Sequence, residues 1–385
     1  MAKDAPLSGL KVVELARILA GPWLGQALAD LGAEVVKVEA PEGDDTRQWG
    51  PPFVERPGPD GGPERSAAYF HAANRGKRSV TADFRTEAGR ERVRRLAAGA
   101  DILLENFKVG GLAKYGLDYE SLAALNPRLI YCSITGFGQD GPYASRAGYD
   151  FLIQGMSGLM SVTGEPDQPP QKVGVAVTDI VTGLYGAVGV LAAVEQRHRT
   201  GRGQHLDLSL LDCAVALMAN QAMNCLASGV APRRLGNAHP NIVPYQAVPA
   251  ADGWIILAVG NDSQFARLCA VLGLAGLASD PAYATNPARV AHRDTLIPRI
   301  EAATRGWRAA ELLAALEAAT VPAGPINDLA GVFADPQVVA RGLQIAPEGV
   351  PGVRGPWRFS DAELRLDRAA PRLGGDGAGT DPAEE

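Results

Sequence analysis

The stretch that decides the fold is KVVELARILAGPWLGQALADLGAEVVKVE, residues 11–39. It begins with a short β-rich run, KVVEL, and ends with a second one, AEVVKVE. Between them, GPWLGQALADLG has a proline near its start and a glycine at its end, which is typical of a helix. Because two strands joined by a helix pair in parallel through a right-handed crossover, this stretch predicts the first unit of an α/β sheet.

The same alternation continues after a Gly- and Pro-rich segment at 41–65, which we expect to be a long surface loop. Further strands are expected at SVTADF, DILLE, RLIYCSI and QHLDL, with helical segments between them. The 385 residues exceed the length at which single cores usually stop growing, so two domains are expected. We predict a doubly wound, mostly parallel α/β domain and a smaller α+β domain. The large domain is expected at 1–224 and 326–372, the small one at 225–325, and a disordered tail at 373–385.

Composition and charge exclude several classes of protein. With 37 basic and 43 acidic residues the net charge is −6, which argues against nucleic-acid binding and against an anionic membrane surface. The longest apolar run, 180–194, is shorter than the ~20 residues that cross a bilayer, so we expect a buried core helix. The histidines show no paired spacing, so no metal site is predicted. A start without a long apolar run, and cysteines without a C-x-x-C pair, favour reduced thiols in the cytoplasm: Cys132, Cys213, Cys225 and Cys269.

A glycine pattern follows the expected strand IYCSI. Gly136-Phe137-Gly138-Gln-Asp-Gly141 matches G-x-G-x-x-G, the pattern of dinucleotide-binding turns. Such a turn needs a helix immediately after it and an acidic residue about 20 positions on, whereas Pro142 and YASRAGYD follow here. We therefore expect these glycines to let the backbone approach a different ligand.

The most informative carboxylate is Asp179, in GVAVTDIVTGLYG. It ends a short extended run and starts the most apolar helix, so an N-cap is the ordinary interpretation. A cap does not explain the apolar, Gly/Pro-rich approach QPPQKVGVAVT. An ionised carboxylate at the positive end of a buried helix can also act as a nucleophile or a base. With a reference pKa of ~3.9, Asp179 is expected to be ionised at pH 7.

Cations gather at two places where phosphate groups could bind. Asn74-Arg75-Gly76-Lys77-Arg78 forms a basic turn before a strand, and Lys108 and Lys114 follow DILLE at the carboxyl edge of the sheet. For the two lysines, a phosphate contact and a plain surface charge remain equally open at this point.

Taken together, several segments resemble the class III CoA-transferase family, which includes formyl-CoA and carnitine CoA-transferases and α-methylacyl-CoA racemases. The resemblance runs from Leu7 to Arg372 and is carried by LAGP, GAEVVKVE, GDDTR, NRGKRS, ENF, SITGFGQDGP, AGYD, VTDIVTGLYG and TGRGQHLDLSLLD. It implies CoA or acyl-CoA as a substrate, no permanently bound cofactor, an interlocked homodimer, and Asp179 as the nucleophile. It also implies CoA contacts from Asn74, Arg75, Lys77, Asn106, Phe107, Lys108 and Lys114, and we add the turn Gly136, Phe137 and Gly138.

The resemblance also bears on the reaction. Racemases of the family carry His where this chain has Tyr149, and a phenol with a pKa of ~10 is a weak proton shuttle, so racemisation is the alternative. A non-catalytic acyl-CoA-binding protein is the second alternative. The segments HPNIVPYQA and DDTRQWGPPF look most like succinyl-CoA:glutarate and other dicarboxylate CoA-transferases, so succinyl-CoA and a dicarboxylate are the expected substrates. Ala40 departs from relatives that have a CoA-binding Arg there. The expected substrate contacts are Ile18, Leu19, Arg47, Trp49, Arg146, Tyr149 and His239.

Overall fold

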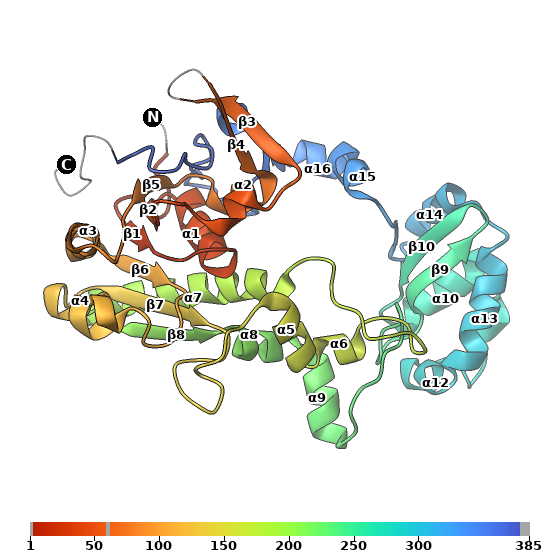
Figure 1. Ribbon diagram of the computed structural model, residues 1–385. Coiled ribbons are helices and arrows are strands. Elements are labelled where there is room, and N and C mark those ends of the chain that lie inside the picture. Colours follow the sequence, from red (N-terminus) through yellow and green to blue (C-terminus); the bar gives the residue numbers. More distant parts are fainter. Residues whose placement is uncertain (1–2, 59–61, 378–385) are drawn as a thin grey trace. The chain divides into compact units, whose positions relative to one another are not determined.

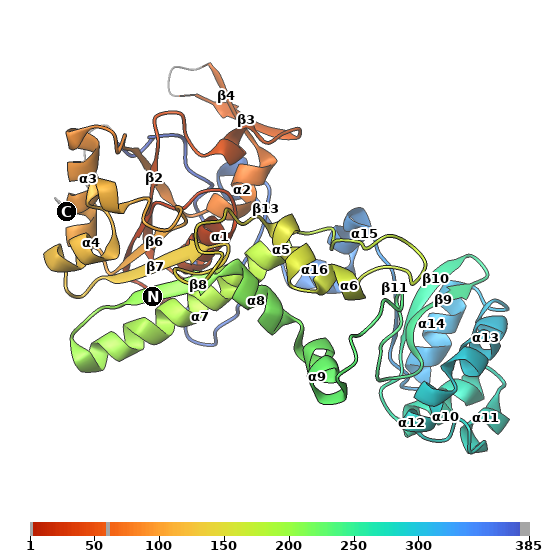
Figure 2. The ribbon, with the colours of Figure 1, turned by 60° about the horizontal axis from the view of Figure 1, so that its bottom comes forward.

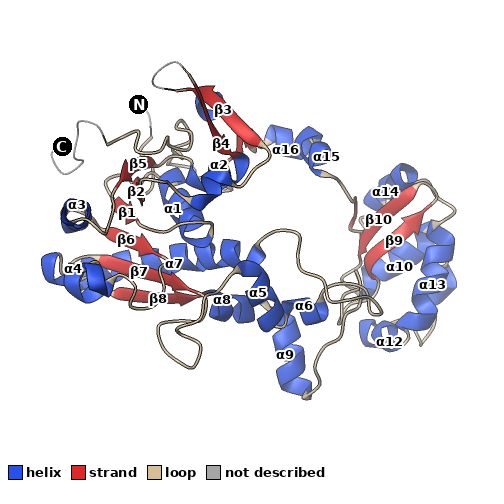
Figure 3. Ribbon diagram, viewed as in Figure 1, coloured by secondary structure: helices blue, strands red, loops and turns tan. Residues whose placement is uncertain are grey.

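The computed structural model describes residues 3–58 and 62–377, which form two compact units. The first unit comprises residues 1–159, 173–229 and 336–385, and the second comprises 160–172 and 230–335. Figure 1 shows the course of the chain, and Figure 3 shows that each unit has a sheet of its own.

The first unit is built on a six-stranded sheet in which all neighbours are parallel. Its strand order is β5-β2-β1-β6-β7-β8. The chain winds outward from β1 in one direction and then, from β6, in the other, which confirms the predicted doubly wound α/β fold. The strands are β1 (Lys11–Glu14), β2 (Glu34–Glu39), β5 (Arg78–Thr81), β6 (Ile102–Glu105), β7 (Ile130–Thr135) and β8 (His205–Ser209).

Helices cover both faces of this sheet (Figure 2). One face packs against α1 (Ala20–Asp30) and α7 (Val177–Thr200), and the other packs against α3 (Glu87–Ala98) and α4 (Tyr119–Leu125). Side chains alternate between the faces along each strand, so Val12 joins the first core and Val13 the second. The other helices of this unit are α2 (Ala68–Asn74), α5 (Asp150–Met156), α8 (Leu210–Leu217), α9 (Ala219–Ser228) and α16 (Pro336–Ala340); α6 (Leu159–Val162) spans the boundary of the two units.

Helix α7 is the apolar helix expected from the sequence, and it is longer than the apolar run itself. Among the residues that the structure describes, it is the one helix long and apolar enough to cross a membrane. It lies against α1, where Gly183 permits close contact, because a Cβ there would be 2.9 Å from the carbonyl oxygen of Ala20. Leu184, Tyr185 and Val188 on the same helix are exposed.

The prediction of a plain surface loop at 41–65 is wrong in part. The segment contains a short 3-10 helix, η1 (Asp45–Gln48), and most of a hairpin of β3 (Phe53–Pro57) and β4 (Pro63–Ala67). The Asp44 side chain caps η1 by accepting a hydrogen bond from the Thr46 amide, and it is buried. Polar residues that look like loop residues in the sequence are here held inside the domain by charge pairing. Residues 59–61 lie outside the described part of the chain.

The second unit has a three-stranded antiparallel sheet, order β11-β10-β9, covered by helices, as expected of an α+β domain. Its bounds differ from the predicted 225–325, because it extends to residue 335 and includes 160–172. Arg234 holds the added segment by donating to the carbonyls of Glu165, Pro166 and Gln168. Its elements are β9 (Tyr245–Ala250), β10 (Gly253–Ala258), β11 (Ala323–Pro325), α10 (Asp262–Val271), α11 (Ala275–Ser279), α12 (Asn286–Ala291), α13 (Arg293–Thr304), α14 (Ala309–Ala318) and α15 (Leu329–Ala334).

With α16 the chain is back in the first unit, where it continues through a small hairpin of β12 (Gln344–Ile345) and β13 (Gly352–Val353), with η3 (Pro347–Gly349) between the two strands. The start of the predicted disordered tail is ordered. Asp376 accepts a hydrogen bond of 2.9 Å from the Ser79 amide and forms ion pairs with Arg78 and Arg368. Asp376 is thus held beside β5 by charged partners. The Gly-rich composition of this segment gives no sign of these pairings. Residues 378–385 of the predicted tail lie outside the described residues.

Candidate active site

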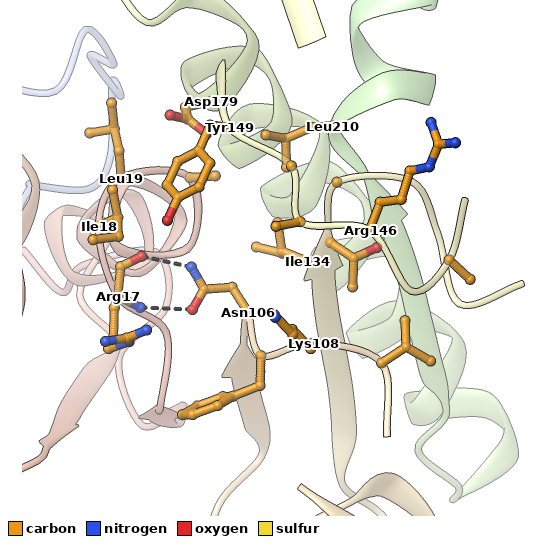
Figure 4. Close-up of a pocket in the computed structure, with 18 residues that line it drawn as sticks. Arg17, Ile18, Leu19, Asn106, Lys108, Ile134, Arg146, Tyr149, Asp179 and Leu210 are labelled. Carbon is orange, nitrogen blue, oxygen red and sulfur yellow. Dashed lines mark hydrogen bonds between the residues drawn. The ribbon is translucent and has the colours of Figure 1, made fainter. Parts of the chain in front are cut away.

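The candidate site is a cavity of about 250 Å³ at the carboxyl ends of the parallel strands (Figure 4). The segment after β1 and the segment after β6 form two of its walls, at the point where the strand order reverses. Ligands of doubly wound sheets bind in the crevice at this switch point. The lining residues are Arg17, Ile18, Leu19, Ala20, Asn106, Phe107, Lys108, Val109, Ile134, Thr135, Gly136, Ala144, Arg146, Ala147, Gly148, Tyr149, Asp179 and Leu210.

Asp179 lies in this cavity, in the first turn of α7. It is not the cap of the helix, because α7 begins at Val177 after Ala176. Asp150 does that work instead: its Oδ1 accepts hydrogen bonds of 2.8 Å from the Thr178 amide and 2.7 Å from the Thr178 hydroxyl. The N-cap interpretation of Asp179 is therefore wrong, and its carboxylate is left to the cavity.

Burial, together with the neighbouring Asp150 carboxylate, raises the pKa of Asp179 from the ordinary 3.8 to about 7. The expectation of a fully ionised Asp179 at pH 7 is corrected by this, since about half of the molecules carry the proton at that pH. A carboxylate with a raised pKa is also a stronger base and nucleophile than an ordinary one.

One wall is the tight turn after β1, and the side chain of Asn106 connects it to the loop after β6 through two hydrogen bonds to the main chain of Arg17. Asn106 Oδ1 accepts a hydrogen bond of 2.9 Å from the Arg17 amide, and Asn106 Nδ2 donates one of 2.7 Å to the Arg17 carbonyl (Figure 4). The Glu105 carboxylate holds the same loop by accepting a hydrogen bond of 2.7 Å from the Phe107 amide. Asn106 thus joins the two walls by hydrogen bonds to the main chain of Arg17, and these contacts fix the position of one wall relative to the other.

Some of the predicted CoA-contacting residues line this cavity, namely Asn106, Phe107, Lys108 and Gly136. Lys108 is exposed, as a lysine that binds phosphate groups needs to be. Arg17 and Arg146, which are also exposed, add two further cations around the same cavity.

The predicted contacts Asn74, Arg75 and Lys77 lie elsewhere. All three are buried, and none lines the cavity. Lys77 Nζ lies 2.8 Å from Glu14 Oε2 and 2.9 Å from Asn74 Oδ1, while Arg75 pairs with Asp30 at 2.6 Å. Burial lowers the pKa of Lys77 to about 8, despite the attraction of Glu14. The basic turn therefore ties helix α2 and strand β5 to the interior, and its cations are already paired.

The other predicted contacts that lie outside the cavity have local partners. Exposed Lys114 lies 4.7 Å from the ring centre of Tyr115. The Gly138 amide donates to the Thr135 hydroxyl at 2.9 Å, and the Phe137 ring packs against Tyr143.

Gly136 of the glycine turn has a structural role that does not depend on a ligand, and the expected approach of a ligand stays a prediction. A Cβ on Gly136 would lie 2.6 Å from the Gly148 Cα. Glycine is therefore needed here because two loops of the chain cross, whether or not a ligand also approaches.

Four of the predicted substrate contacts line the cavity: Ile18, Leu19, Arg146 and Tyr149. Tyr149 is 65% exposed, and the Arg146 guanidinium stacks 3.8 Å over the Tyr143 ring. Both side chains are therefore accessible to a substrate.

The remaining three are not in the cavity. Arg47 is buried, forms hydrogen bonds of 2.8 and 2.7 Å to Glu39, and lies 3.7 Å from the Phe70 ring centre, so it has no free donor face for a substrate carboxylate. Trp49 packs edge-on against Tyr69 with ring centres 5.3 Å apart. His239 belongs to the second unit, where burial and Arg293 lower its pKa.

Three residues of the site were missed by sequence reasoning. Arg17 comes three residues after the end of β1, at the same sheet edge as Lys108, so the argument from strand ends could have found it. Asp150 stands next to Tyr149 in AGYD, but its capping of a helix 28 residues later leaves no local pattern. Tyr69 has no sequence signal: it does not line the cavity, but burial together with the charges of Asp179 and Asp150 raises its pKa to about 12.

Comparison with known proteins decides the family. CoA-transferase family III matches residues 7–377. The chain belongs to this family. It is 60% identical to the succinate–glutarate CoA-transferase of Agrobacterium fabrum over 97% of this chain and 94% of that protein. It is 41% identical to the succinyl-CoA:glutarate CoA-transferase of Mus musculus over 96% of this chain and 84% of that protein.

Solved structures agree. A CaiB/BaiF family protein from Brucella suis is 63% identical with a TM-score of 0.88, and each chain is covered to 98%. A protein from Mycobacterium tuberculosis is 31% identical with a TM-score of 0.86, covering 98% of this chain and 99% of that one. This class III CoA-transferase is therefore an enzyme that acts on CoA thioesters.

Proposed function

We propose that this enzyme transfers CoA from succinyl-CoA to glutarate or another C4–C5 dicarboxylate, with Asp179 as the nucleophile. The observation that carries the proposal is the carboxylate of Asp179, which lies in the switch-point cavity with its capping role taken over by Asp150. The named relatives act on succinate and glutarate, and they share 60% and 41% of their residues with this chain.

The proposed first half-reaction has two steps on Asp179. Its carboxylate attacks the thioester carbonyl carbon of the donor, the C–S bond breaks, and CoA thiolate leaves a mixed anhydride. The thiolate then attacks the carbonyl carbon of Asp179, which expels the donor carboxylate and leaves an aspartyl-CoA thioester. The acceptor carboxylate repeats both steps in reverse, so no water, redox partner or net proton is consumed.

Residues of the cavity support each requirement of this route. Lys108 and Arg146 provide positive charge for the phosphates of CoA and for a substrate carboxylate, and Arg17 lies beside them, with its guanidinium paired to Asp45 at 3.1 Å. Apolar Ile18, Leu19 and Leu210 line the same space as Asp179 and limit access of water to the anhydride.

The covalent step is tested by incubating the enzyme with succinyl-CoA alone, followed by hydroxylamine or borohydride and peptide mass spectrometry. The peptide containing Asp179 should be modified in the wild type and in Asp212→Asn, an exposed carboxylate on α8, but not in Asp179→Asn. Wash-in of solvent deuterium at the α-carbon of a 2-methylacyl-CoA, without a modified Asp179 peptide, would replace the proposal by a racemase.

The acceptor is tested by a matrix of acyl-CoA donors against carboxylic acids. A second carboxylate buried without a partner is costly, so a site with a free cation should favour glutarate over butyrate. We assign Arg146 to that carboxylate because it lines the cavity, its guanidinium stacks over the Tyr143 ring, and it has no ion pair within the part of the chain that the structure describes. Arg146→Gln should lower the glutarate-to-butyrate ratio of kcat/KM by about tenfold, whereas exposed Arg202→Gln should leave it unchanged. Equal use of butyrate and glutarate by the wild type would exclude a dicarboxylate site.

We also propose that the enzyme works as a homodimer. Leu184, Tyr185 and Val188 form an exposed apolar stripe on α7, with exposed fractions of 42%, 45% and 67%. A second copy of the chain is a suitable cover for such a stripe. Light scattering at micromolar concentration should give twice the 40.3 kDa of one chain, and a monomer mass would exclude it.

A further inference from the structure

The turn that forms one wall of the cavity contains a strained residue. Ile18 has a φ of +71°, in the left-handed region that glycine favours and that β-branched side chains avoid. Four non-glycine residues have a positive φ in the part of the chain that the structure describes, and Ile18 alone of these lines the Asp179 cavity. Strained residues of this kind persist only where surrounding contacts impose the conformation.

The contacts that impose it come from the interior. The Asp44 carboxylate accepts hydrogen bonds from the Ile18 amide at 3.2 and 3.4 Å. The Lys37 ammonium donates one of 2.8 Å to the carbonyl of Ala16, on the other side of the turn. Lys37 and Asp44 are themselves an ion pair, with Nζ and Oδ2 3.0 Å apart and both side chains fully buried. One buried ion pair thus holds the turn at its entry and at the strained residue.

The pair is held rigidly in turn. Thr46 donates two hydrogen bonds to Asp44 Oδ1, from its amide at 3.0 Å and from its hydroxyl at 2.8 Å. Lys37 also contacts Glu14 Oε1 at 3.1 Å. Burial alone raises the pKa of Asp44, but the Lys37 charge and the Thr46 hydrogen bonds bring it below its usual value, so the carboxylate stays ionised.

We propose that Lys37 and Asp44 are positioning residues of the transferase, which hold Ile18 in its left-handed conformation and so direct Ile18 and Leu19 into the cavity with Asp179. Neither touches the cavity; they act through the turn. The alternative is that the pair only stabilises the core between β2 and η1. The two roles differ in one respect: only a positioning role depends on which residue stands at position 18.

The test is a double-mutant cycle between positions 44 and 18. Asp44→Asn keeps the shape of the side chain and removes the charge that pairs with Lys37. Ile18→Gly removes the penalty of the positive φ, and Ile18→Ala removes the same side chain while keeping a Cβ. Each single and double variant is measured for kcat and KM in CoA transfer and for its thermal midpoint Tm.

We expect Asp44→Asn to lower kcat about tenfold in the wild-type and Ile18→Ala backgrounds, with a smaller change in the KM of the acyl-CoA donor. In the Ile18→Gly background the same substitution should lower kcat by less than about threefold, because no strain remains to be held. An equal loss in all three backgrounds, or a loss that follows Tm, would overturn the proposal.

Two further variants keep the test decisive if Asp44→Asn does not fold. Thr46→Val removes one hydrogen bond to Asp44 and preserves the side-chain shape, so it should show the same dependence on position 18 in weaker form. Asp101→Asn breaks another pair of unit 1, with buried Arg197 at 2.8 Å, far from the turn in sequence; it should lower Tm and leave kcat within about twofold. The inference rests on the transferase activity and not on Asp179 being the nucleophile, so a failed Asp179 labelling experiment leaves this cycle interpretable.

Discussion

Replacing Asp179 by Asn should stabilise the enzyme at alkaline pH. In the folded protein the pKa of Asp179 is about 7, against an ordinary value of 3.8. Folding therefore opposes ionisation of this carboxyl. The contribution of this group to the free energy of unfolding is fully present below pH 3.8 and is lost as the pH rises through about 7. The reason is that the unfolded chain releases the Asp179 proton at a lower pH than the folded chain does.

The magnitude follows from the two pKa values. At 1.36 kcal/mol per pH unit, the difference between 3.8 and about 7 corresponds to a penalty of about 4 kcal/mol for the ionised form. Solvent screens a side chain that is only partly buried, so we expect about 2 kcal/mol at pH 8. Asn carries no charge at any pH. Its advantage should therefore be about 2 kcal/mol at pH 8 and less than half of that at pH 5.

Denaturant unfolding of the wild type and of Asp179→Asn at pH 5 and pH 8 measures this directly. An ordinary acidic residue in the first turn of a helix gives the opposite sign, since its removal costs about 0.3–1 kcal/mol at pH 8. An Asn variant less stable than the wild type at pH 8, or a gain that is the same at both pH values, would refute the reasoning. Asp212→Asn, an exposed first-turn carboxylate of α8, is the matched control and should show the ordinary sign.

Three further predictions follow from the same contacts. Between pH 6 and pH 8, kcat/KM should rise about tenfold as Asp179 ionises, and Asp150→Asn should move the midpoint to lower pH; a flat profile in the wild type would contradict the raised pKa. Lys108→Ala should raise the KM for acyl-CoA about tenfold, whereas Lys11→Ala, exposed at the opposite edge of the sheet, should not change it. Arg75→Met should lower the free energy of unfolding by about 3 kcal/mol, because it removes the ion-pair partner of the buried Asp30 carboxylate, and should leave the KM for acyl-CoA within about twofold; a large rise in KM with unchanged stability would instead make Arg75 a CoA contact.

The sheet was predictable because each strand has its own short-range signal. KVVEL and AEVVKVE are β-rich, and the helix between them has a proline and a glycine at its ends. Parallel pairing follows from the intervening helices, and the structure has six parallel strands in the doubly wound order. The hairpin of β3 and β4 was not predicted, since its strands contain Pro, Arg and Glu and are held by pairing with each other.

The site residues also fall into a group that the sequence could place and a group that it could not. Lys108 was placed correctly by one argument, that residues after a parallel strand lie at the ligand-binding edge of the sheet. Lys77 and Arg47 are equally basic and equally close to family motifs, yet both are buried against carboxylates of the parallel sheet, Glu14 in β1 and Glu39 in β2. Composition shows that a charge is present, but only the tertiary structure shows whether another charge already neutralises it.

The same distinction separates Asp179, the proposed nucleophile, from the paired charges of the interior. Lys37 is fully buried and forms ion pairs with the carboxylates of Asp44 and Glu14, which are buried as well, so this charge is matched inside the protein and not exposed to a ligand. Asp179 shares a cavity with Arg17 and Lys108, but no ion pair to it is present among the described residues, and its pKa rises accordingly. A carboxylate paired as Asp44 is would have a low pKa and would be a poor nucleophile. The interior charges are thus neutralised by one another, while Asp179, the carboxylate that we propose as the nucleophile, is kept apart from them.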